Sequence, residues 1–306
     1  MTVSPIRRSR RLLALLVVTA AVIVLVSPAP DRTPPAAEVA FANVAEVGPN
    51  CGTTTFTKSN GDPWVCSFVD NFSGTVLDPT KWSPMLTKQT GVITPECRVA
   101  SNKNIAVANG VLKLTVRKET KRMTCYTPTG SYTTQFTGGS VTTASKWDQA
   151  GGRFEIRAKF PATKVAGLHS ALWMWPRYPI YHEHSGEIDI AEYRTNHPGY
   201  VVPYVHYTSE TPDPNRTNNW CAVSRPDYFH LYVLEWTLES IKISFDGKKC
   251  IETRWDPAAP LSFPAPFNRA FYLILTQSLG IKENAFVGGK TPLPATTQVD
   301  YVRVWK

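Results

Sequence analysis

The sequence lacks the patterns that mark helical, zinc-binding and nucleic-acid-binding proteins. No segment of the 306 residues keeps a helical hydrophobic period over three turns, and no internal repeat occurs, so a helical architecture is not expected. No CxxC pair is present and the six histidines do not stand at ligand spacing, which argues against a Cys/His metal site. The net charge is +9, but beyond the N-terminal region only Lys118–Arg122 gathers basic residues, and it includes Glu119. Nucleic-acid binding therefore has little support.

The N-terminal apolar run is too short for an ordinary membrane span. It covers Leu12–Val26 and follows four arginines within residues 7–11, as the apolar part of a secretory signal does. Ser9–Leu13 also resembles a twin-arginine signal, which predicts a bacterial protein exported already folded. We expect residues 1–29 to be a cleaved signal peptide or, if uncleaved, an anchor in the cell envelope, and residues 30–50 to be a Pro/Ala-rich linker.

Six cysteines follow the linker, an even number that argues for disulfide bonds in an exported chain. The spacing alone leaves their connectivity open. We favour sequential pairing, because each bond then closes a modest loop between neighbouring strands. The predicted pairs are Cys51–Cys66, Cys97–Cys125 and Cys221–Cys250.

From residue 64 onward, short strands separated by turn residues account for almost the whole sequence. Asn109-Gly110 is a favoured hairpin turn, and Val111–Arg117 after it alternates between apolar and polar residues. Phe154–Phe160 is apolar at every even position. Evenly spaced strands of this kind predict an all-β fold, a two-sheet jelly-roll sandwich whose concave sheet suits an extended polymer.

Three carboxylates fall within six positions of the segment GEIDIAEY. On a regular strand Glu187 and Asp189 share a face while Glu192 lies on the other, and no helical face holds all three. A β-bulge near Ile190 and Ala191 would absorb one residue and return Glu192 to the shared face. Acids brought together in this way shift one another's pKa values apart, as a double-displacement glycosidase requires. The alternatives are a solvated acidic edge strand and a calcium site.

Glu187–Glu192 resembles the E-x-D-x-x-E signature of glycoside hydrolase family 16, in the bulged form of the laminarinase and β-agarase group. The resemblance covers nearly all of residues 64–306, because further segments follow in the order of the family. These segments are Phe68–Gly74, Asn104–Leu114, Gly152–Pro161, Ala171–Pro176, Phe229–Trp236 and Val299–Trp305. The resemblance implies a concanavalin A-like jelly roll over residues 51–306, with an open substrate cleft and a retaining mechanism.

The same resemblance implies roles for individual residues. Glu187 takes the position of the nucleophile, Asp189 that of an assisting acid and Glu192 that of the general acid/base. Trp173 matches an aromatic residue that stacks on the attacked sugar. A structural role is the alternative for each of the other candidate substrate-binding residues, which are Asn104, His206, Trp220 and Gln277.

Departures from the family pattern lie where sugar subsites are expected. His169-Ser170 stands where laminarinase-like members usually have Trp-Pro, Tyr181–Ser185 lacks a Trp that they often carry, and Thr276–Gly280 differs from their usual segment. The chemistry is therefore better defined than the polysaccharide. Many members also bind one structural calcium, for which Asn71 and Asp300 stand at matching positions.

Taken together, these features predict a secreted, monomeric endo-glycosidase that needs no cofactor beyond a structural calcium. Its expected partner is a polysaccharide, most simply a β-1,3-glucan or a related β-glucan or β-galactan. Contact with a membrane is expected only through an uncleaved N-terminal segment. Transglycosylation with the same carboxylates and a non-catalytic carbohydrate-binding jelly roll are the alternatives, and the complete set of acids argues against the second.

Overall fold

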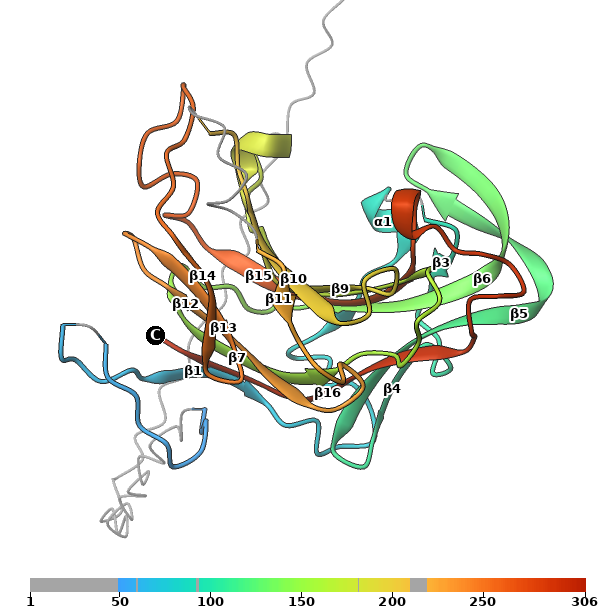
Figure 1. The fold of residues 1–306 in the computed structure, drawn as a ribbon, viewed down its shortest axis with the longest axis horizontal. Helices are drawn as coiled ribbons and strands as arrows, with labels where there is room; N and C mark the ends of the chain where they lie inside the picture. The colour runs from blue at the N-terminus through green and yellow to red at the C-terminus, as the bar shows by residue number, and fades with distance from the viewer. Residues whose placement is uncertain (1–48, 59, 92–93, 181, 210–218) are drawn as a thin grey trace, which may run out of the picture. The chain divides into compact units, whose positions relative to one another are not determined.

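A computed structural model describes residues 49–306 except residues 59, 92–93, 181 and 210–218 (Figure 1). The chain from Val47 to Lys306 forms one compact unit. The predicted signal or anchor of residues 1–29 and nearly all of the predicted linker lie outside the described residues. Within the described part of the chain, no helix is long and apolar enough to cross a membrane.

Strands make up nearly all the regular structure of this unit. The strands are β1 (Cys66–Asp70), β2 (Ser83–Pro84), β3 (Cys97–Arg98), β4 (Ile105–Ala108), β5 (Val111–Thr127), β6 (Gly130–Thr142), β7 (Gly152–Lys159), β8 (Leu168–Pro176), β9 (Glu187–Arg194), β10 (Tyr200–His206), β11 (Cys221–Ala222), β12 (His230–Trp236), β13 (Ile241–Phe245), β14 (Lys248–Thr253), β15 (Phe271–Leu279) and β16 (Ala295–Trp305). The helical elements are α1 (Thr87–Thr90), η1 (His182–Ser185) and η2 (Lys282–Asn284).

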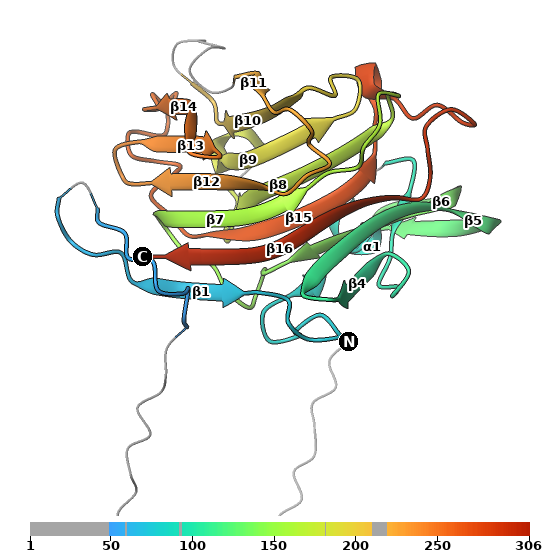
Figure 2. The same ribbon diagram turned by 60° about the horizontal axis from the view of Figure 1, so that its bottom comes forward.

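The strands form two layers that are joined through the long β5–β6 hairpin (Figure 2). The first layer, here called the β9 sheet, has the order β10-β9-β8-β15-β6, and the second, the β7 sheet, has the order β5-β16-β7-β12-β13-β14. Neighbouring strands within both layers are antiparallel. Figure 1 shows the β9 sheet curved, with its hollow side turned away from the β7 sheet. The predicted all-β jelly-roll sandwich is confirmed.

The core lies between the two sheets and follows from the alternation of side chains along each strand. In β8, Leu172 and Met174 are fully buried in the core, whereas Trp173 and Trp175 are only half-buried on the opposite face. In β7, Phe154 contributes a fully buried ring from the other layer. Each large apolar side chain contributes about 1.5–3 kcal/mol when it is buried. This apolar interior therefore holds the β9 sheet against the β7 sheet.

Three disulfide bonds join the predicted cysteine pairs, Cys51–Cys66, Cys97–Cys125 and Cys221–Cys250. The sequential connectivity is therefore confirmed. Each bond links segments that are 15 to 29 residues apart in the chain. Bonds of this kind stabilise the folded state mainly by restricting the unfolded chain.

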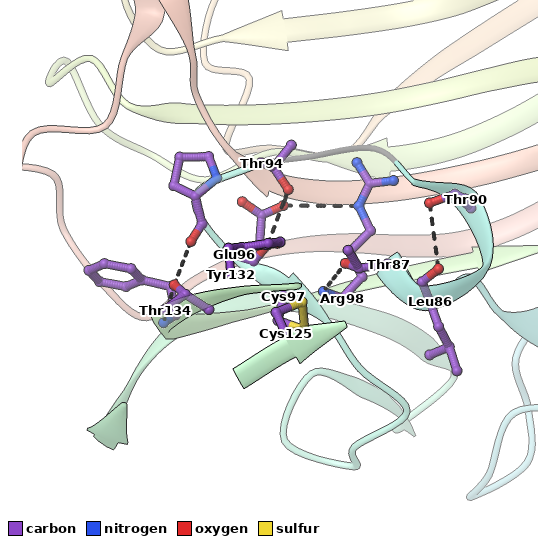
Figure 3. Close-up of a disulfide and its surroundings, with 12 residues drawn as sticks. Leu86, Thr87, Thr90, Thr94, Glu96, Cys97, Arg98, Cys125, Tyr132 and Thr134 are labelled. Carbon is purple, nitrogen blue, oxygen red and sulfur yellow. Dashed lines mark hydrogen bonds and ion pairs between the residues drawn. A yellow bond between two sulfur atoms is a disulfide. The ribbon is translucent and has the colours of Figure 1, made fainter. Parts of the chain in front are cut away.

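The Cys97–Cys125 bond lies beside a buried ion pair between Glu96 and Arg98 (Figure 3). The Glu96 carboxylate accepts hydrogen bonds from the Thr94 hydroxyl at 2.8 Å and from a backbone N–H of β15 at 3.1 Å. Arg98 donates to the hydroxyl of Ser278, also on β15, at 3.3 Å. Short β3 is thereby fixed to a central strand of the β9 sheet.

Candidate active site

A β-bulge interrupts β9 between Asp189 and Glu192. On the β8 side, Leu172 pairs with Ala191 but Trp173 pairs with Asp189, so Ile190 is the additional residue. The register shifts at the same place on the β10 side. The predicted bulge is confirmed.

The partner strand accommodates this bulge with a proline. Val202 and Tyr204 of β10 pair with Glu192 and Asp189, which leaves Pro203 opposite both Ile190 and Ala191. Proline has no N–H to give to a strand ladder, so it is tolerated inside a sheet mainly where pairing is already broken. The sequence of β10 therefore matches the irregularity of β9.

The bulge places all three acids on the face that points away from the core. Asp189 and Glu192 pair with Trp173 and Ala171, which are two residues apart and so share one face of β8. Glu187 lies two residues from Asp189 on the regular part of β9. Since β9 lies between β8 and β10, it is not an edge strand, and the alternative of a solvated acidic edge is wrong.

Each of two carboxylates has a histidine partner. His206 Nε2 lies 2.9 Å from Asp189 Oδ2, so this predicted site residue contacts Asp189 and not Glu192. His169 Nε2 lies 2.7 Å from Glu192 Oε1. The second oxygen of Glu192 accepts a hydrogen bond from Arg194 Nη2 at 2.8 Å. Both oxygens of Glu192 are therefore held.

The site raises the pKa values of two acids. Burial, followed by the negative charge of Asp189, raises the pKa of Glu187 to about 8, although His206 opposes the shift. Burial and the charge of Glu192 likewise raise the pKa of Asp189 well above its ordinary value. Both groups favour the protonated state near neutral pH.

Glu192 behaves in the opposite way. Burial alone would raise its pKa, but the hydrogen bond and charge of His169, together with the charge of Arg194, outweigh burial and lower the pKa below the ordinary value. The site thus keeps one carboxylate ionised beside protonated neighbours. Carboxyl groups with pKa values pushed apart in this way are the usual arrangement for combined acid and nucleophilic chemistry.

Residues 96–288 match the family described as glycosyl hydrolases family 16. The chain belongs to this family. The predicted membership is confirmed by an alignment that spans the carboxylates, both site histidines and most strands of the two sheets.

Several known proteins are similar to this chain. Glucan endo-1,3-beta-glucosidase A1 of Niallia circulans is 32% identical over 260 residues, which are 78% of this chain and 37% of that protein. A beta-glucanase of Rhodothermus marinus is 33% identical over 190 residues, which are 56% of this chain and 63% of that protein. The X-ray structure of a laminarinase from Rhodothermus marinus superposes with a TM-score of 0.66 at 27% identity, covering 79% of this chain and 97% of that one. This chain spans less than two thirds of the length of either of the first two relatives.

Aromatic side chains lie beside the carboxylates. Trp173 pairs with Asp189 across the strands, so its half-buried ring shares the face of the acids, as predicted. Its indole N–H donates to the Thr276 hydroxyl at 3.1 Å, which fixes the ring, and Trp175 lies 6.4 Å away between ring centroids. An immobilised aromatic face in this position suits the apolar face of a pyranose.

Trp220 lines a pocket of about 430 Å³ next to Glu192. Its ring is 48% exposed, and the same pocket is lined by His169 and Arg194, the two groups that hold Glu192. Lys282 lies on the wall formed by η2. Trp220, predicted as a cleft residue, therefore lies in a pocket beside one of the three carboxylates.

Gln277 does not lie in this cleft, contrary to the prediction. It is fully buried on the core side of β15, where its amide oxygen accepts hydrogen bonds from Ser170 at 2.8 Å and from Thr297 at 2.7 Å. Thr297 belongs to β16 of the opposite sheet, so these bonds connect the two layers. The alternation of β15 explains the error, because Thr276 and Ser278 are the residues that face the site.

Asn104 is also buried, with 1% of its surface exposed. Its amide donates to the Thr115 carbonyl at 2.9 Å and to the Thr137 hydroxyl at 3.0 Å, bridging β5 and β6. The predicted contact with a sugar is therefore wrong for this structure, and the alternative structural role holds.

The residues at the predicted calcium position do not fit a calcium ion. The Asp300 carboxylate forms an ion pair with the Arg157 guanidinium, and Arg303 donates to the Asn71 side chain at 3.2 Å. Two cationic groups thus take the oxygens that would be ligands. Among the described residues, no group of three or more His, Cys, Asp or Glu side chains could hold a metal ion.

Proposed function

We propose that this family 16 protein is an exported, retaining endo-glycosidase that cleaves β-1,3-glucan by double displacement. The observation that carries the proposal is the bulge in β9, which gathers Glu187, Asp189 and Glu192 on one face with separated pKa values. A glucan endo-1,3-beta-glucosidase, a beta-glucanase and a laminarinase among the relatives support the substrate class. Three disulfide bonds and the signal-like N-terminal sequence support export.

In the first step, a carboxylate oxygen of Glu187 attacks the anomeric carbon and the bond to the leaving sugar oxygen breaks. That oxygen takes a proton from Glu192. In the second step, water attacks the anomeric carbon, Glu192 accepts a proton from the water, and the Glu187 carboxylate is released. A retaining reaction of this type uses carboxyl groups that are about 5–5.5 Å apart.

The resting site holds the right number of protons in a different arrangement. The pKa values favour protons on Glu187 and Asp189 and an ionised Glu192, whereas the first step needs protons on Asp189 and Glu192. One proton must therefore move within the site before cleavage. In a strongly coupled group of acids, such a rearrangement changes only which oxygen carries the proton, and the total charge stays the same.

The test is the release of reducing sugar from laminarin, with product configuration followed by NMR. We expect β-configured ends to form first, and we expect Glu187→Gln and Glu192→Gln each to lower kcat by about a hundredfold or more. Full activity in both variants would overturn the carboxylate assignment. Binding of laminarin by the parent without release would instead indicate a carbohydrate-binding protein.

A panel of polysaccharides settles the sugar and the reaction outcome. The panel contains laminarin, mixed-linkage β-glucan and a β-galactan, because His169 departs from the family pattern at a subsite position. Products longer than the oligosaccharide supplied would show transglycosylation, which uses the same two glutamates.

A further inference from the structure

His169 and Arg194 enclose Glu192 from two strands. They are cross-strand partners in β8 and β9, and each contacts a different oxygen of the carboxylate, at 2.7 Å and 2.8 Å. The Glu192 side chain is only 9% exposed, so these two donors, and not bulk water, satisfy it. The proposed acid/base is thus held in one orientation before any substrate arrives.

Of these two partners, only His169 has a nitrogen that can either donate or accept a hydrogen bond. The guanidinium of Arg194 has donors only, whereas a ring nitrogen of a neutral imidazole is a donor in one tautomer and an acceptor in the other. Glu192 must carry a proton in the first step and lose it to become the base of the second step. A partner that stays bonded through this change has to donate to the carboxylate and accept from the carboxyl group, and His169 meets that condition.

We propose that His169 is a positioning residue for the acid/base, which holds Oε1 of Glu192 and shares with it the proton that the leaving oxygen receives. The inference rests on the proposed function. It makes a residue that departs from the family sequence pattern part of the acid/base machinery.

The proton balance of the pair follows the two steps. Before cleavage, His169 and Glu192 together receive the proton that leaves Glu187, on either Nε2 or Oε1, in addition to the proton of the neutral imidazole. The leaving oxygen takes this proton through Glu192 as the anomeric carbon bonds to Glu187, and the carboxylate is then stabilised by the remaining donors. When water attacks, its proton returns to the pair and the glycosyl–Glu187 bond breaks.

Several charged groups face Glu192, but only some of them form a hydrogen bond with it. Those on the β9 sheet and across the pocket are Glu187, Asp189, Arg194, His169, His206, Lys282 and Glu283. His206 directs its Nε2 to Asp189, at 2.9 Å, and takes no part in the two hydrogen bonds that hold Glu192. His169 is the group whose hydrogen bond lowers the pKa of Glu192, with its charge adding to the effect.

The decisive variant is His169→Gln, which keeps a hydrogen-bond donor of similar reach and cannot titrate. Carboxyl 13C NMR of glutamate-labelled protein follows Glu192 directly, with its resonance assigned by its loss in Glu192→Gln. In the parent, Glu192 should stay ionised to the acidic limit of the folded protein. In His169→Gln the titration midpoint should rise by about one pH unit or more, because the charge contribution of His169 that lowers the pKa of Glu192 is lost. A midpoint as acidic as that of the parent would overturn the proposal.

The pH profile of kcat/KM on laminarin gives the kinetic counterpart. The basic limb reports loss of the Glu192 proton that the first step needs, and it should move to higher pH in His169→Gln, a change that a purely structural role would not cause. His230→Gln is the matched control, since His230 forms a 2.6 Å pair with Asp246 on the other sheet. It should leave both limbs in place. If the parent hydrolyses no polysaccharide, the proposed function fails, and the NMR titration alone decides whether His169 sets the protonation of Glu192.

Discussion

The imidazole of His206 lies 2.9 Å from the carboxyl oxygen of Asp189 and stacks on the ring of Tyr204, with centroids 3.7 Å apart. Partial burial lowers the pKa of His206 while the pKa of Asp189 is raised. A neutral imidazole beside a protonated carboxyl group is therefore favoured, with Asp189 donating to Nε2. This contact keeps the central acid in a fixed orientation between the two glutamates.

Replacing His206 tests this contact. His206→Ala should lower kcat by about tenfold or more, since loss of a partner from a buried polar group costs roughly 1–3 kcal/mol. His206→Gln offers an amide oxygen as acceptor and should recover part of the activity. Steady-state kinetics on laminarin measure kcat for both variants. Equal losses would show that the hydrogen bond between Asp189 and His206 does not contribute to kcat.

The raised pKa of Glu187 predicts how stability depends on pH. A carboxyl group whose pKa is higher in the folded state stabilises the protein at low pH, and this contribution disappears as the pH rises through the folded value of about 8. Glu187→Gln cannot ionise, so it should be more stable than the parent above pH 8 by about 1 kcal/mol or more. Below the ordinary pKa of a glutamate the two proteins should be alike.

Thermal unfolding from pH 4 to pH 9 measures this difference. The melting temperature of the parent should fall faster with increasing pH than that of the variant. Parallel curves would mean that Glu187 is not protonated in the folded protein. Glu283→Gln serves as the control, because Glu283 is an exposed acid on η2 and is not among the groups that shift the pKa values of Glu187, Asp189 and Glu192.

Local sequence was sufficient to predict some features of the site. The mismatch between the spacing of Glu187, Asp189 and Glu192 and the period of a strand pointed to the bulge, since strand geometry makes parity a strict local rule. The sequential disulfides were likewise predictable, because each joins cysteines only 15 to 29 residues apart and so closes a modest loop.

Other features depended on which strands pair and in which register. The contact between His169 and Glu192 joins residues 23 positions apart, and the sequence showed His169 only as a departure from the family. Counting by twos from Trp173 would have placed it on the site face. The same counting along β15 would have excluded Gln277, whose side chain points into the core.

The Cys97–Cys125 bond should matter for stability and not for catalysis. It anchors short β3 to β5, away from the carboxylates on β9. The double variant Cys97→Ser/Cys125→Ser should lower the free energy of unfolding by about 2–4 kcal/mol, while folded protein keeps its kcat at a temperature well below the transition. Denaturant unfolding and laminarin assays measure the two quantities, and a lower kcat in the folded variant would show that β3 supports the cleft directly.

Trp220 tests where the leaving sugar chain lies. The pocket that it lines adjoins Glu192. Since the proposed acid/base has to face the leaving oxygen, sugars beyond the cleaved bond should occupy this pocket. Trp220→Ala should therefore lower kcat/KM on laminarin by about tenfold, from the loss of roughly 1.5 kcal/mol of aromatic contact. An aryl β-glycoside, whose leaving group is a single small ring, should lose much less. Trp173→Ala is the comparison, since the ring of Trp173 lies beside Asp189, on the side of the attacked sugar. This variant should lower kcat/KM on both substrates. If Trp220→Ala lowered kcat/KM equally on both substrates, the pocket would not hold the leaving sugar chain.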